Sequence, residues 1–180
     1  MKRFTAILSL IALLAFQACE GPVGPQGPMG PQGEDGLYVV GQTFEVEITF
    51  NEGNDYGEVF EFTNEPLVDG DALLVYMLEA SPLDNTQFAW RLLPQTFYLD
   101  QGILVYNFDY TVNDFSIFLD NSPIDFATLD PYYTDNVLFR VVVVPSDLTS
   151  RIDYTNYDAV TEMLGITDDD FVRIPAKSGK

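Results

Sequence analysis

The sequence contains no histidine, a single cysteine and only eight basic residues among its 180 positions. The missing histidine excludes Ser-His-Asp and Cys-His catalytic arrangements and removes the commonest zinc ligand. The single cysteine, Cys19, has no partner for an intramolecular disulfide. Neither a phosphate-binding loop nor a dinucleotide fingerprint is present. We therefore expect a protein that is not an enzyme and that carries no cofactor.

Positive charge is also scarce relative to negative charge. The chain has 28 acidic residues against 8 basic ones, which gives a formal net charge of −20. Such a surface repels nucleic acid and anionic lipid headgroups. We therefore expect no nucleic-acid partner, and we interpret the charge mainly as a means of keeping an exported protein soluble.

The amino-terminal residues have the layout of a secretory signal. Lys2 and Arg3 precede an apolar run from Phe4 to Phe16, interrupted only by Thr5 and Ser9. A helix that spans a bilayer needs about 20 apolar residues, which is more than this run supplies. The pattern predicts a signal peptide over residues 1–18 rather than a permanent transmembrane helix.

The residues before Cys19 do not suit ordinary signal peptidase, because bulky Phe16 stands where a small side chain is needed. The stretch Phe16-Gln17-Ala18-Cys19 resembles the lipobox of bacterial lipoproteins, in the looser form found in Bacteroidota. The resemblance implies that Cys19 receives diacylglycerol and that its new amino group is acylated, typically with palmitate. Several acyl chains, at about 0.8 kcal/mol per buried CH₂, make a permanent membrane anchor. The alternative is an incidental thiol in a discarded peptide.

The lipobox resemblance also predicts a location, which is the cell outer membrane. Glu20 follows the anchor directly, and an acidic residue near this position resembles the surface-export signals of Bacteroidota lipoproteins. That resemblance favours display on the cell surface over a periplasm-facing position.

Residues 19–36 combine the anchor with a glycine repeat. Glycine occupies every third position from Gly21 to Gly36. Proline follows four of these glycines, at Pro22, Pro25, Pro28 and Pro31. The composition is typical of collagen, and it resembles the Gly-Pro-x runs that follow the lipid-bearing cysteine in a group of Bacteroidota lipoproteins. This resemblance covers residues 1–36 and does not extend to the rest of the chain.

Two interpretations of the repeat remain open. Three chains can wind residues 21–36 into a collagen triple helix, which would make the protein a homotrimer. Alternatively, each chain forms a polyproline II rod on its own. In both cases the segment is a spacer that spans roughly 50 Å at ~3.1 Å per residue.

Residues 37–180 predict one all-β domain. Apolar and polar residues alternate from Thr43 to Phe50, as in a half-buried strand, and the run Val59–Phe62 after a turn predicts a hairpin with it. The valines of 141–144 predict a central strand that ends before Pro145. Further strands are predicted at 72–79, 88–93, 103–110, 115–119 and 137–144, with a last short one at 171–174. Many strands with turns between them favour an immunoglobulin-like β-sandwich.

One short helix is predicted near the carboxyl terminus. It begins at a capping box of Thr155 and Asp158 and ends at Gly165. Its apolar stripe comprises Tyr157, Val160 and Leu164. We expect this stripe and Met163 to pack against the domain rather than to form a site.

Two acidic clusters are candidates for calcium binding, because hard cations prefer oxygen ligands. Asp168–Asp170 form the shorter cluster. The other comprises Asn51, Glu52, Asn54, Asp55 and Glu58. Their spacing does not match an EF-hand loop, so ordinary surface acidity is the competing interpretation.

Aromatic residues are candidates for ligand binding. Trp90, Tyr132 and Tyr133 could stack on a sugar ring, whereas the competing interpretation packs Trp90 in the core and places the tyrosines in a turn after Pro131. We expect a lipid-anchored envelope protein with a structural or interaction role and an unidentified protein or glycan partner. The alternative function is that of a glycan-binding surface lipoprotein.

Overall fold

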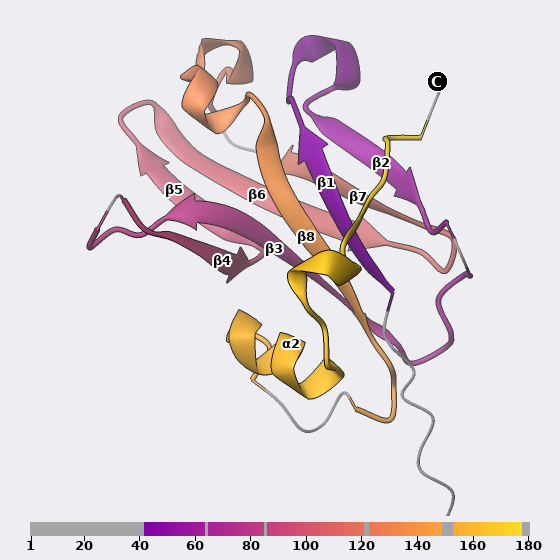
Figure 1. Cartoon of the computed structure of the whole chain (residues 1–180). Helices are drawn as coiled ribbons and strands as arrows, with labels where there is room; N and C mark the ends of the chain where they lie inside the picture. Colours follow the sequence, from indigo (N-terminus) through magenta and orange to yellow (C-terminus); the bar gives the residue numbers. More distant parts are fainter. Residues whose placement is uncertain (1–41, 64, 85, 121–122, 149–152, 178–180) are drawn as a thin grey trace, which may run out of the picture. The chain divides into compact units, whose positions relative to one another are not determined.

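The computed structural model describes residues 42–63, 65–84, 86–120, 123–148 and 153–177 (Figure 1). All of them belong to the compact unit Leu37–Lys180. The predicted signal peptide, Cys19 and the glycine repeat lie outside the described residues, and so do the predictions that depend on them.

Within these residues the chain forms nine β-strands in two sheets and one α-helix. The first sheet comprises, in spatial order, β4 (Phe88–Leu92), β3 (Ala72–Ala80), β8 (Val137–Val144), β1 (Thr43–Ile48) and β9 (Val172–Arg173). The second comprises β2 (Gly57–Glu61), β7 (Asp114–Asp120), β6 (Gly102–Tyr110) and β5 (Gln95–Leu99). Neighbouring strands are antiparallel except for β1 and β9. The prediction of an all-β domain with one short helix is confirmed.

The main core lies between the two sheets. Strand β1 and the residues after it bury every second side chain, so that Phe44, Val46, Ile48 and Phe50 are at most 2% exposed. They pack with buried residues of the second sheet such as Leu104. Each such side chain stabilises the fold by about 1.5–3 kcal/mol. The alternation predicted for 43–50 is therefore the pattern that orients β1.

Strand β8 is buried on both faces, as its run of valines predicts. It lies between β3 and β1 and ends at Val144, before Pro145. Val141 and Val143 face the core between the sheets, whereas Val142 and Val144 belong to a second apolar cluster on the other face. The predicted central position of β8 is confirmed.

Helix α2 (Tyr157–Leu164) covers this second cluster on the outer face of the first sheet. Val160 and Leu164 are buried, and Gly165 ends the helix with a positive φ of 66°. The predicted stripe and the carboxyl-terminal end are confirmed. The predicted amino-terminal cap is wrong, because Asn156 accepts the N–H of Ala159 at 3.1 Å. This helix is too short to span a bilayer, and no other α-helix occurs in the described part of the chain.

Thr155 cannot serve as the cap because its hydroxyl is engaged elsewhere. It donates to Asp153 Oδ1 at 2.6 Å, and the Thr155 N–H donates to the same oxygen at 3.0 Å. These bonds form a small turn immediately before the helix. Asparagine one position later is as good a cap as threonine, so the local turn shifts the start of the helix by one residue.

The predicted hairpin between β1 and β2 is wrong. The two strands belong to different sheets, and β2 pairs with β7. Strand β1 has β8 along one side, and β9 pairs with Phe44 and Glu45 on the other, so β2 is not its neighbour in the sheet. Asp55 and Tyr56, with φ values of 51° and 55°, redirect the chain toward the second sheet.

Strand β5 was not predicted. The chain leaves β4 in the first sheet, passes Pro94 and enters β5 at the edge of the second sheet. Phe97 and Leu99 of β5 pack against the main core, whereas Tyr98 faces away from it. The proximity of Pro94 and the mixed polarity of the strand conceal it in the sequence.

The carboxyl-terminal segment crosses from one sheet to the other. Strand β9, which the run 171–174 predicts, pairs in parallel with Phe44 and Glu45 of β1. Further along, the N–H of Lys177 donates to the carbonyl of Val59 in β2 at 2.7 Å. One short segment thereby joins the edges of both sheets on the same side of the domain.

Short 3₁₀ helices complete the described structure. They are η2 (Glu52–Asn54), η3 (Phe126–Thr128), η4 (Pro131–Tyr133) and η5 (Asp168–Asp170). Figure 1 shows η2, η3 and η4 at the same end of the sheets. The Phe50 N–H donates to the Thr134 carbonyl at 2.8 Å, and the rings of Tyr56 and Phe126 lie 5.1 Å apart. These contacts hold the loops of this end together.

Candidate functional site

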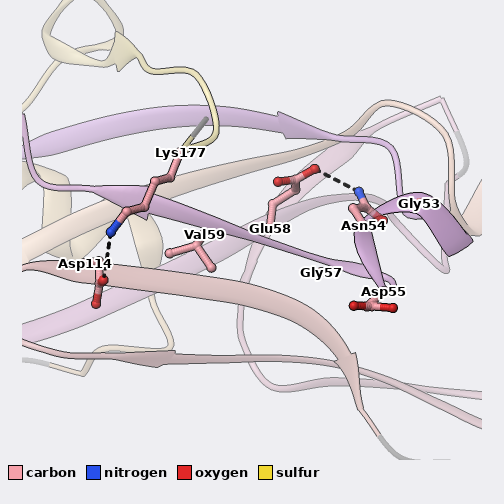
Figure 2. Close-up of a pocket in the computed structure, with 8 residues that line it drawn as sticks. All are labelled: Gly53, Asn54, Asp55, Gly57, Glu58, Val59, Asp114 and Lys177. Carbon is pink, nitrogen blue, oxygen red and sulfur yellow. Dashed lines mark hydrogen bonds and ion pairs between the residues drawn. The ribbon is translucent and has the colours of Figure 1, made fainter. Parts of the chain in front are cut away.

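Two open surface hollows contain residues that the sequence analysis selects. The first, which we name the Lys177 hollow, has a volume of about 540 Å³ and lies beside β2. It is lined by Gly53, Asn54, Asp55, Gly57, Glu58, Val59, Asp114 and Lys177. Figure 2 shows Lys177 and Asp114 at one end of this hollow and Asn54 and Glu58 at the other.

The predicted calcium ligands around η2 form a turn whose oxygen atoms bind the chain itself. Asn51 Oδ1 accepts the N–H of Gly53 at 2.9 Å, and Asn54 Oδ1 accepts the N–H of Asn51 at 2.9 Å. The Asn54 amide then donates to Glu58 Oε1 at 2.9 Å. Glu52 lies exposed in the first turn of η2. This bonding explains the cluster as a reciprocal cap rather than as a coordination shell.

The other end of the Lys177 hollow holds an ion pair. Lys177 Nζ lies 2.7 Å from Glu61 Oε1 and 3.6 Å from Asp114 Oδ2. The hydrogen bond from Lys177 to Glu61 raises the pKa of the lysine. Within the described residues, no group of three or more acidic side chains converges as a metal site requires. The calcium hypothesis receives no support from these contacts.

The second acidic cluster is also engaged in internal bonds. Asp170 Oδ2 accepts the N–H and the hydroxyl of Thr167, each at 2.7 Å, which caps η5. Asp168 Oδ1 lies 2.5 Å from the guanidinium of Arg140. Asp169 is exposed between them. The cluster therefore fastens η5 to the first sheet.

Arg140 is the centre of this attachment. It projects from β8 on the face that α2 covers, and the whole residue is 9% exposed. Its guanidinium lies over the rings of Trp90, at 4.6 Å, and Phe171, at 4.2 Å. Its polar partners are the Tyr157 hydroxyl at 2.7 Å, Asp168 at 2.5 Å and Glu45 at 3.4 Å. Sequence reasoning missed this cluster, because its members are scattered along the chain.

Trp90 is partly buried within this cluster. Its ring contacts Arg140 and lies 5.7 Å from the ring of Tyr157. It packs on the outer face of the first sheet rather than in the core between the sheets. A ring engaged in this way does not form an open stacking platform.

The structure does not bring Trp90 and the two tyrosines to one surface. Trp90 is opposite Leu78 in the β3–β4 register, whereas the Tyr132 hydroxyl donates to Glu79 Oε2 at 3.2 Å. Adjacent residues of a strand point to opposite faces. Trp90 and Tyr132 therefore contact opposite sides of β3.

Tyr132 and Tyr133 lie in η4, so the predicted turn after Pro131 is confirmed. Tyr132 is 57% exposed. Tyr133 is partly buried against the main core, with its ring 5.6 Å from that of Phe97. Its carbonyl accepts the hydroxyl of Tyr106 at 2.6 Å.

Tyr133 also lines the second hollow, which we name the Tyr98 hollow. This hollow has a volume of about 470 Å³ and lies where the β5–β6 turn meets η3 and η4. It is lined by Tyr98, Leu99, Asp100, Gln101, Thr128, Asp130 and Tyr133.

The polar side chains of the Tyr98 hollow keep hydrogen-bonding capacity. The side chains of Asp100 and Gln101 form no hydrogen bond within the part of the chain that the structure describes. Asp130 uses Oδ1 to accept the N–H of Tyr132 at 2.9 Å. The Thr128 hydroxyl donates to the Asp125 carbonyl at 2.7 Å and keeps its lone pairs. The lining is therefore rich in acceptors.

Of the residues that line this hollow, only Tyr133 is among the candidates predicted from the sequence. Four of the others lie in the stretch Thr96 to Gly102, where Tyr98 stands between the apolar Phe97 and Leu99 and a polar turn follows. An aromatic residue on the polar face of a strand is what that pattern singles out.

One buried carboxylate lies outside both hollows. Glu79 is 7% exposed, and burial raises its pKa, although the Tyr132 hydroxyl and the charge of Arg91 act in the opposite direction. Arg91 itself donates to the Ala80 carbonyl at 3.1 Å. Glu79 therefore lies at the base of η4 without lining either hollow.

Comparisons with protein-family models, curated proteins and solved structures each found nothing similar to this chain.

Proposed function

We propose that the protein is a lipid-anchored component of the bacterial cell envelope, held in the outer membrane through Cys19. Its collagen-like segment 19–36 is the spacer, and an immunoglobulin-like β-sandwich is the part that it presents. The domain acts by binding a partner rather than by catalysis.

The observation that carries the proposal is the position of Cys19. It follows an apolar signal that is too short for a bilayer-spanning helix, and the glycine repeat begins two residues later. Anchor and spacer are thus contiguous. The resemblance of both to Bacteroidota lipoproteins supports attachment to the outer membrane, and Glu20 supports the cell-surface side.

The described domain supports a binding role in two ways. Its buried charged groups, such as Arg140 with Glu45, join secondary-structure elements together. Its open hollows carry acidic and aromatic side chains at the surface. Glu79, the buried carboxylate whose pKa is raised, lines neither of them. These features suit recognition more than proton transfer, which needs a perturbed group within reach of a substrate.

The anchor is tested by replacing its sulfur. Cells that express Cys19→Ser are grown with labelled palmitate and fractionated, and we expect the label to disappear from the protein and the protein to leave the membrane fraction. Gln17→Ala is the matched control, because it keeps the cysteine and supplies a smaller residue; it should label normally. A Cys19→Ser protein that still sediments with membranes would refute the proposed anchor.

The membrane face is tested separately by treating intact and lysed cells with protease. Cleavage of the domain in intact cells is expected for surface display. Protection in intact cells and cleavage only after lysis would assign the domain to the periplasmic side.

A further inference from the structure

We propose that the Tyr98 hollow is a carbohydrate-binding site. The inference rests on the proposed binding role and specifies the partner's chemistry: a neutral oligosaccharide with one ring face stacked on Tyr98. Trp90 and Tyr132 do not line this hollow, so the site differs from the aromatic platform expected from the sequence.

Tyr98 supplies the stacking surface. It is 83% exposed, although it belongs to a regular strand in which it pairs with Ile103. Its ring faces away from the main core, because its neighbours Phe97 and Leu99 pack inward. The negative face of an aromatic ring attracts the polarised C–H groups on the apolar side of a pyranose. A bound sugar would thus cover a ring that the fold leaves in water.

Tyr133 borders the hollow from η4, and its main chain is fixed. Its carbonyl is held by the buried Tyr106 hydroxyl at 2.6 Å, and its N–H donates to the Asp130 carbonyl at 2.8 Å. Its ring lies against Phe97 in an edge contact, on the core-facing side of β5 and so on the opposite face from Tyr98. A lining segment that is already in place adds no ordering cost when a ligand binds.

The polar lining matches hydroxyl groups better than it matches ions. Asp100 and Asp130 accept hydrogen bonds and repel anions. Gln101 both donates and accepts, as does each hydroxyl of a sugar. A cationic ligand only donates, so it would leave the donor groups of Gln101 unmatched. The mixed set therefore favours a neutral polyhydroxyl ligand.

The size of the hollow agrees with this assignment. A volume of about 470 Å³ lies within the range of roughly 300–1,000 Å³ that small-molecule sites occupy. The hollow is open to solvent, so a chain of sugar units can extend beyond it. We therefore expect recognition of an internal or terminal segment of an oligosaccharide.

The test uses the full chain, purified in detergent and applied to an array of neutral and acidic oligosaccharides of bacterial, plant and animal types. We expect binding to a subset of the neutral oligosaccharides, little changed between low and high salt. Tyr98→Ala should weaken that binding by about tenfold or more, the effect of one lost stacking contact. Gln101→Ala should weaken it less.

Tyr110→Ala is the matched control, because Tyr110 is also a surface tyrosine, 45% exposed, but lies outside the hollow. It should bind as the parent protein does. The proposal is overturned if no oligosaccharide binds, if Tyr98→Ala binds normally, or if binding is confined to acidic oligosaccharides and vanishes with salt. Membrane fractionation of Cys19→Ser is independent of all these outcomes, so the anchor and the carbohydrate site can fail separately.

Discussion

The hydroxyl of Tyr106, a residue with no exposed surface, donates a hydrogen bond to the carbonyl of Tyr133 at 2.6 Å. Tyr106 belongs to β6 and Tyr133 to η4, so the bond fixes a loop to the centre of the second sheet. Burial raises the pKa of Tyr106, and the phenol therefore stays protonated and remains a donor. The wall of the Tyr98 hollow is positioned from within the core.

Tyr106→Phe should lower the free energy of unfolding by about 1–2 kcal/mol, because it leaves the partly buried Tyr133 carbonyl without its donor. It should also weaken carbohydrate binding by releasing Tyr133. Urea denaturation and the oligosaccharide array measure the two effects.

Tyr76→Phe is the control for this pair of effects. Tyr76 is equally buried and donates to the Tyr154 carbonyl at 2.8 Å, but it lies on the α2 side of the first sheet. It should lose similar stability and keep full binding. Equal binding by Tyr106→Phe and the parent protein would show that Tyr133 does not contribute through this bond.

Arg140→Met should destabilise the domain by about 2 kcal/mol, because it removes the hydrogen bonds from the guanidinium to Tyr157 and Asp168 and leaves Glu45 with Arg173 alone. The Glu45 side chain is 20% exposed. The fluorescence of Trp90, the single tryptophan, reports the unfolding transition and should also shift when the guanidinium leaves its ring.

Arg173→Met provides the comparison. Arg173 contacts the same Glu45, at 3.2 Å, but its side chain is 61% exposed. An exposed pair of this kind contributes only about 0–1 kcal/mol. If both substitutions cost the same, burial between Trp90 and Phe171 is not what makes Arg140 important.

Glu79→Gln should stabilise the domain at neutral pH. Since burial raises the pKa of Glu79 in the folded state, the folded protein holds this proton to higher pH than the unfolded chain does. The parent protein therefore loses stability as the pH rises through the folded-state pKa. Glutamine keeps an acceptor for the Tyr132 hydroxyl and has no charge to bury.

The measurement is urea denaturation at neutral pH and at about pH 4, near the usual glutamate value. The gain from Glu79→Gln should be largest at neutral pH and shrink toward the acid value. Glu52→Gln, which removes one carboxylate from an exposed position, is the control for the loss of charge itself. A gain that grows as the pH falls would contradict the assigned direction of the shift.

Deletion of residues 21–36 tests the two interpretations of the glycine repeat. If the repeat forms a triple helix, the full chain in detergent should sediment as a trimer and the deletion variant as a monomer. Equal association states would remove the trimer and leave the single polyproline II rod. The same deletion should leave palmitate labelling at Cys19 intact.

Strands and helices with strong periodic patterns could be predicted from the sequence. Apolar residues mark the buried faces of a strand. The alternation from Phe44 to Phe50 therefore indicates one buried face, and the apolar run 141–144 indicates two. The end of α2 at Gly165 follows from the left-handed conformation that glycine tolerates.

Pairing between strands could not be predicted in the same way. The hairpin of β1 with β2 fails because β1 pairs instead with β8 and β9, which come much later in the chain. Similarly, β5 lies at the edge of a sheet, and only its residues Phe97 and Leu99 pack against the main core. Two apolar residues are too few to predict the strand. The local sequence of a strand does not indicate which distant strand pairs with it.

The site residues follow the same division. Tyr133 was identifiable as an aromatic residue in a turn, but Tyr98 and Asp130 come together only because the β5–β6 turn and η4 meet. The polar residues around η2 look like cation ligands in the sequence, yet Asn51 and Asn54 bond to their own turn. The type of a residue indicates which ligands its side chain could bind. Tertiary contacts decide whether that side chain is free to bind them.

The interior position of β1 has a mechanical consequence. Strand β1 is the first strand of the described domain, and it is hydrogen bonded to β8 on one side and to β9 on the other. A tensile force applied at its amino-terminal end acts along the strand, at right angles to the ladder bonds of the antiparallel β1–β8 pair. When the domain is held at the opposite end of the sheet, the bonds of that pair, six residues long in register, share the load in shear instead of opening one after another. The domain is thus built to resist extraction through the end by which it would be tethered.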